Sequence, residues 1–559
     1  MTDDLLGGHP ATSGDDAPLT VTTLFRHVVR THGDQEIVYR TADGGWDRYT
    51  FAEYGTRVSA IASALAEIGV APGDVVGVLD WNSKRHFELY GAVPLTGAVL
   101  LQMNLRLAPS DLAYVTTHAK ATVVLVDESL LDVAEAIAPR ATGVHRWVVM
   151  TDRPVEELQT TLPDVTSFEE LVVPGTPPGT RPDSWPAMAE SAAYSACYTT
   201  GTTGRPKGVF YSHRAVYLHA MTLASQLQMG NGDCALLIAP MFHALSWGLP
   251  QAAVYVGAKI VLPGRYTAAD TSVLLDAIVA EGVTVTNGSP TIYQAMLDQV
   301  SRSADTPDLR RLRMLCGAAE PTVALMRGLE ERTGAEVIHG YGATETTALI
   351  ALNRAKASTV ASLSEEERWD LRRCQGLPLP GLEIRIVGED GEDLPHDGRA
   401  IGEVLVKGPG VATSYYDLPG ADSAFTDGYW RTGDLGTILP SGYLKLTDRL
   451  KDVIKSGGEW ISSIDMENAL TTHPHVREAA VVGMPDEKWQ ERPVALVVLT
   501  PGTSVSDEDL LATLEGRFAR WQMPGQIRVV DEIARTSVGK IDKRSIRESL
   551  AQELDGHLV

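Results

Sequence analysis

Short apolar runs alternate with longer amphipathic segments from about Val21 to Gly340. The run from Val75 to Leu79 consists of Val, Leu and Gly, which is typical of a strand buried on both faces. The segment from Phe51 to Gly69 instead spaces its apolar residues as one face of a helix. This alternation predicts an α/β fold of layered sheets with largely parallel strands.

The pattern changes after Gly376. Shorter β-like runs, Glu383 to Val387 and Glu403 to Lys407, are separated by Gly-Asp turns, which predicts a β-rich subdomain. A fresh α/β pattern begins after Asp448 and is the size of a small domain. We therefore expect a large N-terminal domain over residues 1–448 and a small, mobile α+β domain over residues 449–559.

Charge and the N-terminal segment narrow the function classes. The chain has 72 acidic and 48 basic residues, a formal net charge of -24, which repels nucleic acid, so we expect no nucleic-acid partner. Its acidic N-terminus has no apolar run, and the apolar stretch Gly91 to Met103 is shorter than the ~20 residues of a membrane span. Four cysteines without C-x-x-C spacing favour a reducing compartment. We expect a cytoplasmic protein without a transmembrane segment.

The segment from Tyr198 to Gly208 is rich in Gly and Thr and contains a lysine. Its N–H and O–H donors and its one ammonium match the needs of polyphosphate oxygens. It is not a Walker A motif, because Pro206 stands where the second Gly would be. A solvated turn is the alternative for a Gly-Thr pair alone. The candidate phosphate-binding residues are Thr199, Thr200, Gly201, Thr202, Thr203, Gly204 and Lys207.

This segment resembles the phosphate-binding signature of the adenylate-forming superfamily, which includes acyl-CoA synthetases, firefly luciferase and nonribosomal-peptide adenylation domains. Four further segments occur in the family's order and at compatible separations: Tyr341 to Glu345, Tyr429 to Asp434, Asp448 to Asp452, and Gly539-Lys540. The resemblance implies the superfamily's two-domain fold, with ATP, Mg²⁺ and coenzyme A as cofactor and co-substrates.

The resemblance also implies roles for the nucleotide-binding residues. Glu345, with Thr200, is a ligand of Mg²⁺, and Thr344 donates to the α-phosphate. Asp434 accepts from the ribose hydroxyls, with Arg449 on the other side of the nucleotide. By themselves Thr-Glu is equally typical of a helix start, and Gly-Asp of a turn. Other residues implied in nucleotide binding are Gly317, Ala318, Ala319, Glu320, Gly340, Tyr341 and Gly342.

The C-terminal part carries the implied second half of the reaction. Lys540 matches the family's catalytic lysine, which neutralises charge between carboxylate and α-phosphate, and Lys451 matches its hinge. One departure is Ala534, where the family usually has Pro. Rotation about the hinge then replaces Lys540 with another face of the domain, which builds the CoA tunnel. The residues expected to face CoA are Lys455, Ser456, Gly457, Gly458 and Glu459.

The acid is the least defined substrate. The stretch from Met241 to Leu249 resembles the family's acyl site, with His243 near the carboxylate and Trp247 in the wall, and Trp460 resembles the aromatic gate of fatty acyl-CoA ligases. A satisfied core His and interdomain packing of Trp460 are the alternatives. Apolar walls favour a monocarboxylic acid, with medium- or long-chain fatty acids ahead of aryl or methylthio acids. Transfer to a carrier protein stays open as the alternative to CoA. Many relatives are homodimers, so a homodimer is also expected.

Overall fold

The computed structural model describes residues 9, 12–13, 16–172, 185–199, 205–303, 305–456, 459–486, 489–535 and 541–556. The side chains of residues 459 and 554–556 lie outside this description. Two predicted segments therefore fall outside the described residues: 200–204 of the Gly/Thr-rich loop, and 536–540 with Lys540. Gly457 and Gly458 fall outside as well.

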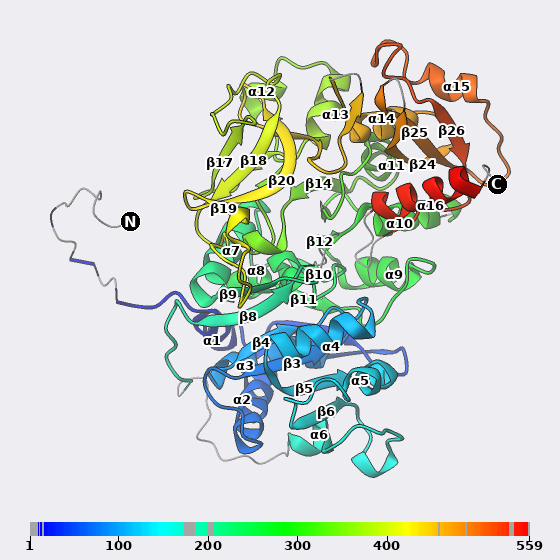
Figure 1. Cartoon of the computed structure of the whole chain (residues 1–559). Helices are drawn as coiled ribbons and strands as arrows, with labels where there is room; N and C mark the ends of the chain where they lie inside the picture. Colours follow the sequence, from blue (N-terminus) through cyan, green and yellow to red (C-terminus); the bar gives the residue numbers. More distant parts are fainter. Residues whose placement is uncertain are drawn as a thin grey trace.

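A seven-stranded sheet forms one end of the molecule, in the blue and cyan part of Figure 1. Its strands are parallel except for the last pair, β8 and β9, which form an antiparallel hairpin. The order is β7 (Val165–Ser167), β6 (Arg146–Met150), β5 (Ala121–Asp127), β3 (Val75–Leu79), β4 (Val99–Gln102), β8 (Ala193–Tyr198) and β9 (Gly208–Ser212).

A nine-stranded mixed sheet lies beside it. Its central strands are parallel, as the apolar runs predict, and its edges are antiparallel. The order is β16 (Leu377–Pro378), β15 (Ala351–Leu352), β14 (Glu336–Tyr341), β13 (Arg313–Cys316), β12 (Val285–Gly288), β10 (Cys234–Leu236), β11 (Lys259–Leu262), β1 (Glu36–Arg40) and β2 (Trp46–Thr50).

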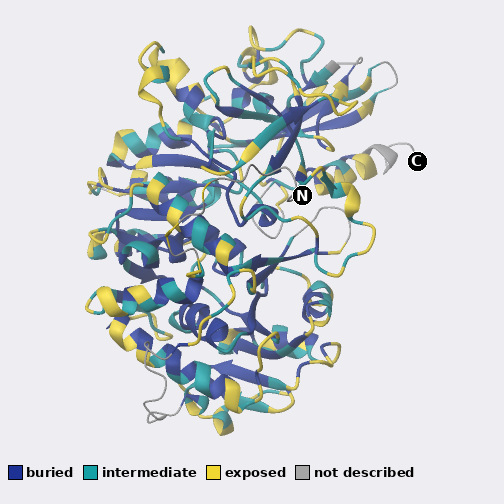
Figure 2. Cartoon of the chain, turned by 90° about the vertical axis from the view of Figure 1, so that its left-hand side faces the viewer, coloured by how far each residue is buried: buried dark blue, intermediate teal, exposed yellow. Residues whose placement is uncertain are grey.

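Helices complete a layered arrangement around these two sheets. One apolar core joins the facing sides of both sheets through α1 (Val21–Thr31), α2 (Phe51–Glu67), α3 (Lys84–Leu95), α7 (His213–Gln226) and α8 (Leu249–Val256). A second core lies under α9 (Ser272–Glu281), α10 (Pro290–Arg302) and α11 (Val323–Thr333), and a third under α4 (Pro109–His118) and α5 (Leu131–Ile137). Figure 2 shows the buried strands inside and the exposed residues on the outer helices.

Two smaller sheets follow. The first contains β17 (Glu383–Val387), β18 (Gly402–Lys407), β19 (Phe425–Thr426), β20 (Tyr429–Ile438) and β21 (Leu444–Arg449). The second contains β22 (Ile454–Ser456), β23 (Glu459–Ile461), β24 (Val476–Asp486), β25 (Gln490–Leu499) and β26 (Gln526–Val529). Short helices α6 (Phe168–Leu171) and α12 (Ala357–Val360) lie in the large part of the chain, with α13 (Glu365–Arg373). Helices α14 (Ser463–Leu470), α15 (Asp507–Ala512) and α16 (Lys543–Gly556) accompany the last sheet.

The predicted α/β fold with a β-rich subdomain and a small C-terminal α+β part is confirmed. The local reasons are visible in the helix ends: the side chain of Ser364 accepts the N–H of Glu367, whose carboxylate accepts the N–H of Ser364, and α13 begins at the next residue. All four cysteines are free and buried. Within the described residues, no helix is both long and apolar enough to cross a bilayer.

Candidate active site

The Gly/Thr-rich loop leaves the seven-stranded sheet at the β8–β9 hairpin. Its two ends are joined by backbone: the N–H of Thr199 donates to the Lys207 carbonyl at 2.9 Å, and the N–H of Lys207 donates to the Thr199 hydroxyl at 3.3 Å. A hairpin neck of this kind fixes where the loop starts and ends. It therefore fixes the direction in which Lys207 leaves the sheet.

Lys207 and Glu345, which are far apart in the sequence, meet through Tyr415. The Lys207 ammonium lies over the Tyr415 ring, 4.7 Å from its centroid, and the Tyr415 hydroxyl donates to Glu345 Oε1 at 2.6 Å. Burial, and then the Glu345 carboxylate, raise the pKa of Tyr415, so its hydroxyl stays protonated and remains a donor. The N–H of Tyr416 donates to Gly208 at 2.9 Å and holds this segment beside the loop. The Lys207 ammonium and the Glu345 carboxylate thus contact the same aromatic residue, one at its ring face and the other at its hydroxyl.

Thr344 and Glu345 lie in a tight turn directly after β14. The turn needs a glycine at Gly342, because a Cβ there would lie 1.8 Å from the Ala348 carbonyl oxygen. The Tyr211 hydroxyl donates to the Thr344 carbonyl at 2.8 Å, and the N–H of Ala412 donates to the Glu345 carbonyl at 2.7 Å. Both residues are buried, and these two hydrogen bonds fix their backbone.

Asp434 joins the same strand end from the β-rich sheet. The Tyr341 hydroxyl, at the end of β14, donates to Asp434 Oδ2 at 2.5 Å. Arg449 lies across from Asp434 on the neighbouring strand β21, with its Nε 3.6 Å from Asp434 Oδ1. Burial, and then Asp434, raise the pKa of Tyr341, which keeps this phenol a donor. Asp434, the predicted ribose-binding carboxylate, is therefore held at the end of β14, next to the turn that contains Thr344 and Glu345.

The predicted acyl segment contains an unusual backbone. Ala244, Leu245, Ser246 and Trp247 have φ between 44° and 57°, and Gly248 continues the run at 80°. A left-handed turn of non-glycine residues costs roughly 1–2 kcal/mol per residue, so the surroundings must hold it. His243 precedes the run and is half-buried. The Trp247 ring lies against Gly317, where a Cβ would be 3.4 Å from the indole. This contact joins the predicted acyl wall to the predicted adenine loop.

Glu320 is the last residue of the predicted adenine loop, and its side chain contacts residues outside that loop. Its carboxylate accepts from Arg373 at 2.7 Å, from Gln375 at 3.0 Å and from Asn468 at 2.9 Å. Asn468 lies on α14 of the last sheet, and Arg373 also pairs with Asp465 of α14 at 2.6 Å. The side chain of Glu320 thus joins the large part of the chain to α14.

The predicted hinge and CoA residues lie at the start of the last sheet. Lys451 is exposed between β21 and β22. Lys455 and Trp460 face each other across the β22–β23 pair, and the N–H of Lys455 donates to Glu491 at 2.9 Å. Ser456 is buried, and its hydroxyl has no hydrogen-bond partner among the residues that the structure describes. The backbone of Glu459 is described, and it pairs with Ser456.

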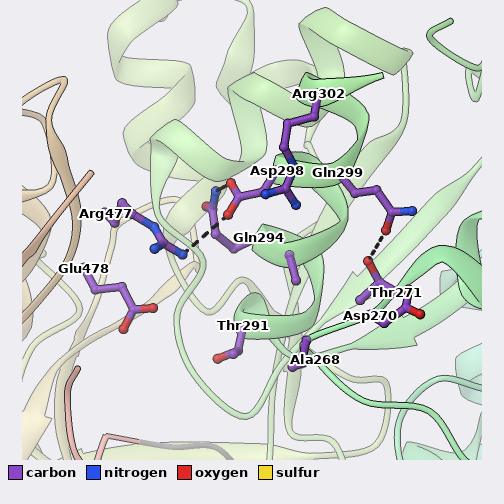
Figure 3. Close-up of a pocket in the computed structure, with 12 residues that line it drawn as sticks. Ala268, Asp270, Thr271, Thr291, Gln294, Asp298, Gln299, Arg302, Arg477 and Glu478 are labelled. Carbon is purple, nitrogen blue, oxygen red and sulfur yellow. Dashed lines mark hydrogen bonds and ion pairs between the residues drawn. The ribbon is translucent and has the colours of Figure 1, made fainter. Parts of the chain in front are cut away.

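A pocket of about 500 Å³ lies between α10 and the first residues of β24 (Figure 3). Its charged side chains are largely paired: Arg477 lies 3.5 Å from Asp298, and Glu478 pairs with Arg535 at 2.5 Å. None of the predicted site residues lines this pocket. It belongs to the junction with the last sheet and not to the nucleotide cluster.

Sequence reasoning missed Tyr415 and the junction residue Arg373. Tyr415 belongs to a Ser-Tyr-Tyr sequence in a loop, and its only special property is the place to which the fold brings it. Arg373 is the last residue of a charged helix, where a solvated face is the ordinary expectation. No sequence pattern marked either residue.

Glu345 is the carboxylate of this cluster that could hold a hard metal ion. Within the described part of the chain, no group of three or more His, Cys, Asp or Glu residues is arranged to hold a metal ion. Mg²⁺ is usually held by one or two carboxylates, with phosphate oxygens and water completing its shell. Glu345, beside the end of the phosphate loop, supplies such a carboxylate.

Lys207, Glu345, Tyr341 and Asp434 thus bring a cation, a carboxylate and a ribose-type acceptor to one place, which defines an adenylate-forming site. A family model described as AMP-binding enzyme matches residues 25–416, and one for the AMP-binding enzyme C-terminal domain matches residues 465–540. The chain belongs to the AMP-binding enzyme family. The prediction of an adenylate-forming acyl-CoA synthetase is confirmed.

The similarity to individual relatives supports this family assignment. The chain is 41% identical to a long-chain-fatty-acid–CoA ligase of Thermus thermophilus, over 98% of both chains. It is 37% identical to a 3-methylmercaptopropionyl-CoA ligase of Ruegeria lacuscaerulensis, over 96% of this chain and 98% of the relative. Among solved structures, an anthranilate CoA ligase in complex with anthranoyl-AMP matches with a TM-score of 0.84 and 25% identity, over 97% of this chain and 100% of that one.

Proposed function

We propose that the protein is a fatty acid–CoA ligase. It joins a medium- or long-chain fatty acid to AMP, releasing pyrophosphate, and then transfers the acyl group to the thiol of CoA. The observation that carries this proposal is the convergence of three charged groups: Lys207 lies on the Tyr415 ring, Glu345 accepts from the Tyr415 hydroxyl, and Asp434 accepts from the Tyr341 hydroxyl. The named activities of the Thermus relative, and of a medium-chain-fatty-acid–CoA ligase of Ectopseudomonas oleovorans at 37% identity over 95% of this chain, support the acid class.

The first step needs charge neutralised and the two reactants aligned. A carboxylate oxygen attacks the α-phosphorus of ATP, the bond to the β-phosphate bridge breaks, and pyrophosphate leaves. Lys207 stands ready for the triphosphate, because its ammonium rests on the Tyr415 ring, a contact that a phosphate oxygen can replace. Mg²⁺, when bound at Glu345 and Thr200, neutralises phosphate charge. We place Lys540 at the developing charge between carboxylate and α-phosphate.

The second step uses the other part of the chain. The thiol sulfur of CoA attacks the acyl carbon, AMP leaves, and the thiol proton goes to solvent or to the departing phosphate. We propose the domain boundary after Asp448, Lys451 as the hinge, and the hairpin from Lys455 to Trp460 as the surface that faces CoA. Support comes from β21, which ends at Arg449 in the β-rich sheet, and from β22, which starts the last sheet.

The test is a panel of acids, from butanoate to stearate with 3-methylmercaptopropionate and cinnamate, assayed for pyrophosphate release and for CoA thioester. We expect the highest kcat/KM for a fatty acid of eight or more carbons. A maximum at 3-methylmercaptopropionate would move the substrate to the class of the Ruegeria relative. Pyrophosphate release without thioester in the presence of CoA would point to a carrier protein as acceptor.

Lys540→Ala tests the two-step logic in the same assay. The variant should lose adenylate formation by about a hundredfold or more, while thioester formation from supplied acyl-adenylate stays within a few-fold of the parent. Equal loss of both half-reactions would contradict the role of Lys540. The homodimer and the cytoplasmic location stay predictions.

A further inference from the structure

The left-handed turn from Ala244 to Gly248 is held by side chains that the acyl-site prediction did not include. His219, on α7, donates from Nε2 to the Trp247 carbonyl at 3.1 Å. Asn287, at the end of β12, donates from Nδ2 to the Ser246 carbonyl at 2.6 Å and to its hydroxyl at 3.0 Å. The Ser246 hydroxyl in turn donates to the Ala239 carbonyl at 2.7 Å. Two carbonyls of the turn are therefore fixed from separate elements.

The chemistry of both clamping residues suits this task. His219 is buried, and burial lowers the pKa of its imidazole, so the ring is neutral and its one N–H is committed to the Trp247 carbonyl. Asn287 is fully buried, and its Oδ1 accepts the N–H groups of Ile238 and Ala239, each at 3.1 Å. That pair of acceptor bonds fixes which end of the amide faces Ser246.

Packing adds to the hydrogen bonds. A Cβ on Gly248 would lie 2.3 Å from His219 Cδ2, so the imidazole occupies the space that any larger residue at Gly248 would need. Gly248 and His219 are complementary at the end of the turn. The direction of the Trp247 side chain, which reaches Gly317, then follows from a backbone that cannot relax toward the ordinary right-handed region.

We propose that His219 and Asn287 are positioning residues for acid recognition: by holding the left-handed turn they fix the Trp247 wall and thereby the acid that the pocket accepts. This rests on the proposed function, because it takes the turn as the wall of an acyl site. Neither residue is a catalytic group. Their effect appears in the affinity for the acid and in the preference among acids, and not in the handling of ATP.

The experiment compares His219→Leu, which removes the donor, with His219→Gln, which retains an N–H near the position of Nε2. In His219→Leu we expect KM for the preferred acid to rise about tenfold and the ratio of kcat/KM between octanoate and palmitate to change several-fold, with KM for ATP within about twofold. His219→Gln should recover most of the acid affinity. Asn287→Asp, which retains the acceptors toward Ile238 and Ala239 but loses the donors toward Ser246, should resemble His219→Leu.

His213→Leu is the matched control. His213 begins the same helix and is also a buried imidazole with a hydrogen bond, from the N–H of Val21 at 3.3 Å, but it faces α1 and not the turn. It should change stability without changing the acid profile. If His219→Leu and Asn287→Asp fold and leave acid KM and chain-length preference unchanged, the inference is wrong while the ligase activity stands. Absence of acid-dependent thioester in the parent protein would overturn the proposed function itself.

Discussion

Lys207 and Lys543 are two lysines whose ammonium groups contact different kinds of partner, an aromatic ring and a carboxylate. The Lys207 ammonium lies on the Tyr415 ring at the mouth of the phosphate loop. Lys543, at the start of α16, is only 9% exposed, and its ammonium is 2.8 Å from Glu467 of α14 and donates to the Ser463 hydroxyl. Ser463 also donates to Asp448, at the end of β21. We expect the Lys207 ammonium to bind a substrate, whereas the Lys543 ammonium stabilises the fold through its buried ion pair.

The difference shows that the group a lysine contacts distinguishes a lysine that serves the reaction from one that stabilises the fold. Burial disfavours the Lys543 ammonium, but the attraction of Glu467 and then of Asp448 outweighs it and raises the pKa of Lys543. An aromatic face stabilises an ammonium by only about 0.5–2 kcal/mol and can yield it to a phosphate. The comparison predicts opposite outcomes when each lysine loses its charge.

The largest expected effect belongs to Lys543→Met. It leaves the buried Glu467 without its counter-charge, and breaking a buried pair from one side costs about 3–5 kcal/mol of unfolding free energy. Urea unfolding followed by a probe in the small domain measures it. Adding Glu467→Leu should restore most of the loss, because the carboxylate that Lys543 neutralises is then removed as well. Arg544→Met, at the next position on an exposed face, is the control, and a similar loss there would defeat the comparison.

Lys207→Met should lower activity and leave stability nearly unchanged. Adenylate formation should fall by about 10²–10³-fold, as for the removal of one charge-stabilising group in an active site, while the melting temperature stays near that of the parent. The two are measured by pyrophosphate release and by thermal unfolding. A loss of stability comparable to that of Lys543→Met would show that Lys207, too, is consumed by the fold.

His213 extends the comparison of the two lysines to a buried basic side chain for which no ion pair is seen among the described residues. Burial lowers its pKa from 6.5 to about 4. Between those pH values the unfolded chain binds more protons than the folded one, so the free energy of unfolding falls as pH drops from 6.5 toward 4. At 1.36 kcal/mol per pKa unit this group contributes about 3 kcal/mol to that fall. Urea titrations across this range should show a shallower fall in His213→Leu than in the parent protein, and an equal fall in both would contradict this role of His213.

The smallest effect is expected at the junction. Arg373→Met removes the link between Glu320 and Asp465, and because Gln375 and Asn468 still donate to Glu320 while Asp465 is partly exposed, we expect a loss of about 1 kcal/mol. Trypsin should therefore cut near Lys451 about fivefold faster, since cleavage follows the open population. Arg372→Met is the control, because Arg372 pairs with Glu330 inside the large part of the chain at 2.6 Å. Equal rates for both variants would leave the junction without a role in domain position.

Much of the fold and of the candidate site could be predicted from the sequence. The features that could not be predicted depend on contacts between residues far apart in the chain. The apolar run at Val75 to Leu79 and the capping box at Ser364 depend on neighbours in the chain, so local rules locate β3 and α13. Nothing local marks Tyr415, because its value comes from two groups that the fold brings to it. The left-handed turn was likewise unpredictable, since Ala-Leu-Ser-Trp prefers right-handed backbone and two of the side chains that hold the other hand, His219 and Asn287, come from distant elements.

The buried cysteines have a chemical consequence for an enzyme that makes an activated acyl group. Burial raises the pKa of Cys197 and Cys234 to about 12 and of Cys374 to about 11, and it raises that of Cys316 further. At neutral pH each sulfur is therefore a protonated thiol in the interior, a poor nucleophile toward a mixed anhydride. The enzyme is thus protected from acylating itself during turnover, and it should retain its activity in the presence of iodoacetamide.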